Sequence, residues 1–162
     1  MILALSRAPH DAQNAVVHAL DDGATLVWEL LNNEPGDALL AAPVDVRPGW
    51  VMRHDRIDFP PGGIAYRHTH PGPGIRYLLF GRLTIDSGGE VHVYGPGDPW
   101  FESGPEPVLA TASATEETAF VRVLLLPGEW AGKRTIAYVD PADEERPKLQ
   151  RPTVYGEHPV AF

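Results

Sequence analysis

Short apolar runs, separated at fairly regular intervals by glycine and proline, dominate the sequence from Gly36 onward. The chain has 162 residues, of which 16 are glycine and 17 are proline. Together these make about a fifth of the chain, whereas about 12% is average. The runs between them are rich in Val, Ile, Leu, Tyr and Phe. Because short strands joined by tight turns form antiparallel sheets, this texture predicts an all-β sandwich or barrel.

The central part of the chain contains a series of predicted strands. Their expected ranges are 51–59, 64–70, 76–80, 82–86, 90–94, 100–102, 108–112 and 119–126. The sequence Asp86-Ser87-Gly88-Gly89 between two of these runs is typical of a hairpin turn, since glycine adopts the positive φ values that such turns require.

The two ends of the chain have different patterns. Between residues 11 and 33, apolar residues recur at intervals of three and four around Asp21-Asp22-Gly23, and this spacing predicts two short helices. From residue 132 onward, isolated prolines and acidic pairs predict an extended segment. We therefore expect an N-terminal helical or extended segment (1–43), a barrel (44–131) and a C-terminal arm (132–162) that packs on the barrel or on a dimer partner.

The charge balance excludes some partners. The chain has 13 Lys and Arg against 22 Asp and Glu, a formal net charge of −9, which repels nucleic-acid phosphates and anionic membranes. No nucleic-acid or membrane partner is expected, and early charged residues in place of a signal peptide favour a cytoplasmic location. Cysteine is absent, so any metal site must use nitrogen and oxygen ligands.

A pair of histidines is the strongest candidate for chemistry. His68 and His70 are two positions apart in the predicted strand 64–70. Side chains alternate across a strand with a period of two, so Tyr66, His68 and His70 are expected on one face. The pattern therefore predicts two imidazoles directed at one point.

These residues also carry a family resemblance. The segment from Gly62 to Gly81, with His68-Thr69-His70-Pro71 near its centre, resembles the first motif of the cupin superfamily, and residues 58–63 are similar to its germin-like version. Gly95-Pro96-Gly97-Asp98, with Trp100 and Phe101 after it, resembles the turn and strand that open the second motif. The resemblance implies a cupin-type double-stranded β-helix, which is a jelly-roll barrel.

Metal-binding cupins contribute two His and a Glu from the first motif and a His from the second. Here the Glu position falls on Gly74 or Ile75 and the second-motif His position falls near Val108, none of which can bind a metal. His68 and His70 remain as expected ligands of a divalent transition metal such as Zn, Fe, Ni, Cu or Mn. The candidates for a third ligand are His54, Asp58, His92, Glu102 and Glu106. A metal-free catalytic or substrate-binding role, or two inert barrel histidines, are the alternatives.

Four further residues are candidates for the site. If position 74 faces the barrel interior, alternation places Arg76 there too, where it meets a carboxylate such as Glu102 or Glu106 or binds an anionic substrate; a register error would instead leave it in solvent. Arg122, in the last predicted strand, is likewise expected either in the site or in solvent. Tyr66 is a possible general acid or a pocket wall, and Trp100 fills the core or contacts a ligand.

The resemblance and these residues together suggest a small-molecule enzyme. It would act on an oxygenated, anionic substrate by isomerisation, cyclisation, decarboxylation or dioxygenation. His68 and His70 would hold a metal, Arg76 and Tyr66 would be catalytic, and Arg76, Trp100 and Arg122 would bind substrate. The alternative is a non-catalytic sensor or carrier that has lost its metal site. A homodimer is expected, because arms and edge strands of single-domain cupins often pack across a dimer.

Overall fold

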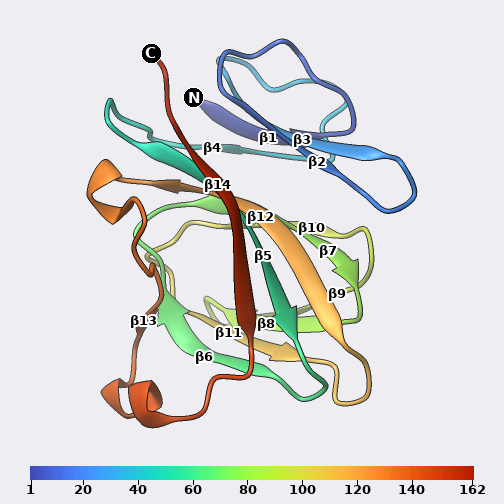
Figure 1. Cartoon of the computed structure of the whole chain (residues 1–162), viewed down its shortest axis with the longest axis vertical. Helices are drawn as coiled ribbons and strands as arrows, with labels where there is room; N and C mark the ends of the chain where they lie inside the picture. Colours follow the sequence, from blue (N-terminus) through green and yellow to red (C-terminus); the bar gives the residue numbers. More distant parts are fainter.

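The computed structural model describes all 162 residues and is built almost entirely of strands (Figure 1). The strands are β1 (Ile2–Ser6), β2 (Ala15–Ala19), β3 (Thr25–Leu31), β4 (Leu40–Pro43), β5 (Val51–Phe59), β6 (Ile64–Thr69), β7 (Gly74–Phe80), β8 (Leu83–Ser87), β9 (Glu90–Tyr94), β10 (Pro99–Glu102), β11 (Val108–Ala112), β12 (Thr118–Leu126), β13 (Ala137–Tyr138) and β14 (Arg151–Pro159). Two 3₁₀ helices, η1 (Gly128–Trp130) and η2 (Pro141–Glu145), complete the regular structure. The predicted all-β fold class is confirmed.

The strands form three sheets. The N-terminal sheet has the order β2-β3-β1-β4, the second sheet β10-β7-β12-β5-β14 and the third sheet β13-β6-β11-β8-β9. The second and third sheets face each other as the two walls of a jelly-roll barrel, and the N-terminal sheet, at the top of Figure 1, lies on the outer side of the second sheet. Every paired strand in the molecule is antiparallel to its neighbour.

Two hydrophobic clusters hold these layers together. The first joins the N-terminal sheet to the outer face of the second sheet and includes Trp28 and Val123, both fully buried. The second fills part of the barrel interior and includes Phe59 and Phe120. All nine residues of β12 are buried. Val121, Val123 and Leu125 enter the first cluster from one face of the strand, while Phe120 enters the second cluster and Arg122 lines the cavity from the other face.

The predicted central strands agree with the structure. The ranges 51–59, 90–94 and 108–112 coincide with β5, β9 and β11, and the others differ by one or two residues at an end. β8 and β9 form the expected hairpin, in which Gly88 and Gly89 have φ values of 60° and 79°.

The two short helices predicted between residues 11 and 33 are wrong. That segment forms β2 and β3, which pair as a hairpin around Asp21-Asp22-Gly23, with Gly23 at φ 84°. The apolar spacing fits both the helical period and the strand period, and tertiary burial decides between them. Leu26, Trp28 and Leu30 alternate along β3 and all enter the first cluster. The Asp-Asp-Gly sequence is therefore a hairpin turn and not a break between helices.

The C-terminal segment packs on the same chain's barrel. β13 pairs with β6, and β14 pairs with the outer edge of β5. The end of the chain is tied to the N-terminal sheet by two hydrogen bonds: the side-chain amide of Asn14 donates to the carbonyl of Ala161 (2.8 Å) and accepts from its N–H (2.7 Å). No helix in the chain has the length and apolar character needed to cross a membrane.

Candidate active-site cavity

A cavity of about 750 Å³ lies inside the barrel. This volume is in the range of small-molecule sites in proteins. Both barrel sheets line it, together with the segment 132–157 that follows the last long barrel strand. Its apolar wall consists of Ile57, Phe59, Ala65, Ile85, Trp100, Val108, Ala110 and Phe120. The other lining residues are largely polar or charged, so the cavity has an apolar side and a polar side.

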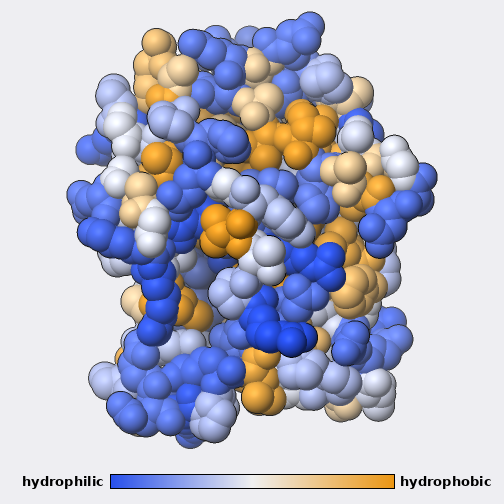
Figure 2. All heavy atoms as spheres, viewed as in Figure 1, coloured by the Kyte–Doolittle hydropathy of each residue, from blue (hydrophilic) through white to orange (hydrophobic).

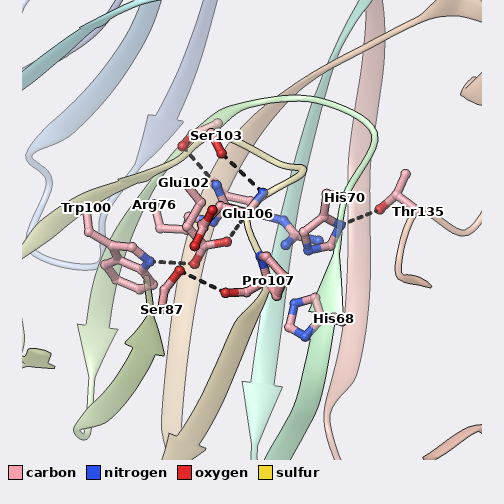
Figure 3. A network of polar contacts seen from close by, with 12 residues as sticks. His68, His70, Arg76, Ser87, Trp100, Glu102, Ser103, Glu106, Pro107 and Thr135 are labelled. Atoms are coloured by element: carbon pink, nitrogen blue, oxygen red, sulfur yellow. Dashed lines mark hydrogen bonds and ion pairs between the residues drawn. The ribbon is translucent and has the colours of Figure 1, made fainter. Parts of the chain in front are cut away.

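His68 lies on the polar side of the cavity (Figure 3). Its Nδ1 is 2.7 Å from the backbone carbonyl of Tyr66. A carbonyl only accepts hydrogen bonds, so Nδ1 carries the proton and Nε2 has a free lone pair in the neutral ring. Burial lowers the pKa of His68, which keeps the ring neutral at pH 7.

His70 follows β6 and is held by the C-terminal arm. Its Nδ1 is 3.1 Å from the hydroxyl of Thr135, a residue that is itself buried. Its Nε2 is buried and has no hydrogen-bond partner in the protein. Burial, followed by the charges of Arg122 and Arg76, holds the pKa of His70 well below its usual value. The hydroxyl of Thr135 can either donate to Nδ1 or accept from it, so the contact is compatible with both neutral tautomers of His70, and Nε2 is a buried ring nitrogen without a partner.

The two imidazole rings are close to each other. Their centroids are 4.9 Å apart and their planes are nearly perpendicular, at 83°. The sequence prediction that the pair shares one face is thus confirmed.

Arg76 is inside the barrel and 1% exposed. Its Nη1 donates to the carbonyl of Gly74 (2.8 Å), and its Nη2 is 2.8 Å from Oε2 of Glu102. That ion pair has no aligned hydrogen bond, because Nη2 makes none. Burial lowers the pKa of Arg76 to about 10, so the guanidinium stays charged at pH 7. Trp100 donates its indole N–H to Oε1 of Glu102 (2.9 Å), which fixes the carboxylate (Figure 3).

Arg122 forms a second buried ion pair. It binds both carboxylate oxygens of Asp55, with Nε to Oδ1 at 2.7 Å and Nη2 to Oδ2 at 3.1 Å. Arg122 lies opposite Asp55 on β5 and opposite Arg76 on β7. Two guanidiniums are therefore neighbours across the second sheet, and each has its own carboxylate on the side away from the other.

Tyr66 does not share the face of the two histidines, contrary to the sequence prediction. Val108 pairs with His68 whereas Ala110 pairs with Ala65, so β6 has one extra residue in a bulge. Because the bulge shifts the alternation, Ala65 and His68 line the cavity and Tyr66 does not. The Tyr66 ring instead lies under the guanidinium of Arg146 (5.0 Å to the ring centroid).

The candidates for a third metal ligand are scattered. Of the five, Glu102 alone lines the cavity. His54 packs in a ring cluster with His18, Trp28 and Tyr155, outside the cavity. The others are also outside: Asp58 binds Arg56, His92 is exposed and pairs with Glu90, and Glu106 is exposed.

Sequence reasoning did not find every residue of the site. Thr135 and Asp55 were missed, as were Lys133 and Lys148, which line the opening of the cavity. Asp55 could have been noticed, because it alternates with Ile57 and Phe59 in an otherwise apolar strand face. The other three are in the C-terminal arm, and no local pattern predicts which barrel surface an arm covers.

Comparison with known families identifies the architecture. The model of the cupin domain matches residues 55–105, from β5 to just beyond β10. This segment contains the histidine pair and lies wholly within the jelly-roll barrel. Residues 55–105, about a third of the chain, therefore match a cupin domain.

Solved structures similar to this chain include an RmlC-like cupin from Shewanella frigidimarina (18% identity, 52% of this chain and 81% of that chain, TM-score 0.42). The polyketide cyclase RemF from Streptomyces resistomycificus is 19% identical, with 60% of this chain and 80% of that chain covered and a TM-score of 0.43. A cupin superfamily protein from Desulfitobacterium hafniense is 13% identical, with 74% of this chain and 84% of that chain covered and a TM-score of 0.42. A comparison with curated proteins found no match.

The donor set in this barrel does not fit the metal site that the resemblance implies. No group of three or more His, Asp or Glu residues is placed to hold a metal ion. Val108 is opposite His68, where the second-motif histidine was expected, and a Cβ on Gly74 would lie 2.4 Å from the carbonyl oxygen of Val123. Burial lowers the pKa of both histidines, and the guanidiniums of Arg122 and Arg76 lower it further, although Glu102 raises that of His68.

Proposed function

We propose that this cupin is a small-molecule enzyme that moves a proton on an oxygenated, anionic substrate. The observation that carries the proposal is the buried, unpartnered Nε2 of His70 in a cavity of about 750 Å³. A buried polar atom without a partner is costly, and such groups concentrate at functional sites. Isomerisation, cyclisation and decarboxylation all need a proton moved at carbon or oxygen, and this set of residues suits them.

The proposed reaction begins with His70 as general base. In the tautomer in which Nδ1 donates to Thr135, Nε2 takes a proton from a carbon next to a substrate carbonyl, which gives an imidazolium and an enolate. The enolate oxygen would accept a hydrogen bond from Nη2 of Arg76, which lines the cavity and makes no hydrogen bond within the protein. The imidazolium then returns the proton to a different atom of the substrate. His68, fixed in one tautomer, offers a second acceptor beside the first.

The other residues have supporting roles in this proposal. Trp100 forms the wall of the cavity and orients Glu102. Thr135 orients the ring of His70 through Nδ1. Tyr66 has no role, since its ring is outside the cavity.

Hydrogen exchange tests the proposed proton transfer. The protein would be incubated in D₂O with a panel of keto acids and aromatic carboxylates, and loss of C–H signals would be followed by ¹H NMR. We expect at least one compound to exchange, and His70→Gln to slow the exchange at least about a hundredfold while the compound still stabilises the fold. His92→Gln, which changes an exposed histidine on β9, is the matched control and should exchange at the wild-type rate.

A non-catalytic binding protein is the second candidate. It is favoured by the pairing of both inner arginines with carboxylates and by the incomplete metal-ligand set. Compounds that raise the melting temperature without any exchange or turnover, in wild type and in His70→Gln alike, would support this second function against the first.

A further inference from the structure

The chain contains two lysines, Lys133 and Lys148, and both line the opening of the barrel cavity. Lys133 is exposed and Lys148 is half-buried, so they mark where the cavity meets solvent. In Figure 2 a column of strongly hydrophilic atoms follows the arm on the left, with a hollow between it and β14. Although the chain has a net charge of −9, both of its lysines lie at the cavity opening.

The cations deeper in the cavity are already neutralised. Arg76 is paired with Glu102 and Arg122 with Asp55, as described above. Arg53 is paired with Glu157, at 2.5 Å between Nε and Oε1. Each of these arginines has a carboxylate of its own, so the inner cavity has no net charge with which to attract an anion.

The cations at the opening are not neutralised to the same degree. The cavity opening, defined here as Lys133, Arg134, Tyr138, Glu144 and Lys148, contains three cations and a single carboxylate. Glu144 binds Arg134 through both of its oxygens (2.8 and 3.1 Å). Lys148 contacts the backbone carbonyl of Glu144 and not its carboxylate, and Lys133 has no ion pair. Two positive charges therefore remain available.

Two other features of the opening favour a bound group. The Tyr138 ring has the guanidinium of Arg134 5.5 Å from its centroid and the ammonium of Lys148 4.8 Å from it, which holds both cations in place. Gln150, the next lining residue along the arm, has a buried Oε1 without a partner. A polar ligand group with a hydrogen to donate would satisfy this oxygen.

Resting on the function proposed above, we infer that the cavity takes an amphipathic anion, with its apolar body against Phe59 and Phe120 and its anionic group, a carboxylate or phosphate, at Lys133 and Lys148. This assigns the recognition of the substrate's charge to the arm and not to Arg76. The inner arginines then act on the reacting centre alone.

A matched pair of fluorescent probes tests this assignment. 8-Anilinonaphthalene-1-sulfonate is an apolar body with an anionic group, and N-phenyl-1-naphthylamine is the same body without it. We expect Lys133→Gln and Lys148→Gln each to weaken binding of the sulfonate about three- to tenfold and to leave binding of the neutral probe unchanged. Arg47→Gln, which removes an exposed cation outside the cavity, should change neither.

Glu144→Gln gives a test of opposite sign. Removing the single carboxylate of the opening frees Arg134, so the sulfonate should bind more tightly while the neutral probe is unaffected. A variant that merely loosened the arm would weaken both probes. Adding 0.5 M NaCl should weaken the sulfonate in wild type and have a smaller effect in the lysine variants, because salt screens exposed charges.

Failure of this inference can be told apart from failure of the proposed function. If both probes bind the cavity and the lysine variants affect neither, the assignment of the opening is overturned and the cavity remains a binding site. If neither probe binds, or if Ala110→Phe, which adds a ring to the cavity wall, leaves both unaffected, the cavity itself is not a binding site and the proposed function fails. Binding of carboxylate and phosphate esters of one apolar alcohol to wild type then decides between the two anionic groups.

Discussion

At the scale of single residues, each buried arginine inside this barrel contacts a carboxylate. An isolated buried guanidinium costs several kcal/mol, so Arg76 requires Glu102 and Arg122 requires Asp55. The two pairs differ in geometry. Arg122 holds both oxygens of Asp55 in a bidentate contact, whereas Arg76 contacts one oxygen of Glu102 without an aligned hydrogen bond.

Glu102→Gln should destabilise the protein by about 3 kcal/mol, because it leaves Arg76 buried without a compensating charge. Urea unfolding followed by tryptophan fluorescence measures the change. Combining it with Arg76→Met should recover much of the loss, since the uncompensated charge is then gone. Asp45→Asn, which breaks an exposed pair with Arg47, should change stability by less than about 0.5 kcal/mol and is the control.

The protonation of the two histidines can be measured directly. Long-range ¹H–¹⁵N NMR spectra should show both His68 and His70 neutral at pH 6.5, with His68 protonated at Nδ1, because burial lowers both pKa values. Both rings should begin to charge only below the pH range in which an ordinary imidazole does. An imidazolium signal from either ring at pH 6.5 would contradict the role of a neutral base.

At the scale of elements, the junction between the N-terminal sheet and the barrel contains a second group of histidines. His54 on β5 is buried against His18 on β2 and Tyr155 on β14, with ring centroids 5.1 and 4.7 Å away. Burial, together with the charges of His18 and His158, lowers the pKa of His54 to about 4, although Asp55 opposes this shift. Three strands from distant parts of the chain thus surround one ring that must stay neutral.

This junction predicts a loss of stability in mild acid. The unfolded chain binds a proton at His54 near pH 6.5 and the folded chain near pH 4, so stability falls as the pH drops from 6.5 toward 4. His54→Phe keeps a ring in the cluster and removes the titration. Its free energy of unfolding should therefore fall by about 2 kcal/mol less than that of wild type between pH 7 and pH 4.5. His92→Gln should follow the wild-type dependence, and equal slopes for wild type and His54→Phe would contradict the assignment.

At the scale of the whole molecule, several sheet edges remain open. β2 and β9 are edge strands of their sheets, and Val17, Val91 and Val93 on them are each more than half exposed. Unpaired strand edges with apolar side chains favour association with another chain.

The homodimer expected from the sequence stays a prediction at this scale. Size-exclusion chromatography with light scattering should give about 35 kDa, twice the chain mass of 17.7 kDa. Val91→Lys and Val17→Lys are the matched variants, since each adds a charge to one open edge. A mass near that of one chain for the wild type at micromolar concentration would exclude the dimer.

The sequence by itself determined the barrel strands, the hairpin at Gly88 and the placement of His68 and His70 on one face. These features depend on a period of two and on turn residues, which are local properties of the chain. Only the tertiary structure decided the rest. The apolar spacing of the N-terminal strands also fits helices, and burial of one strand face in the first hydrophobic cluster decides the outcome. The bulge in β6 that turns Tyr66 outward depends on the pairing of β6 with β11. The arm that brings Thr135 to His70 and both lysines to the cavity opening is positioned by contacts with strands more than 60 residues earlier, which no local pattern encodes.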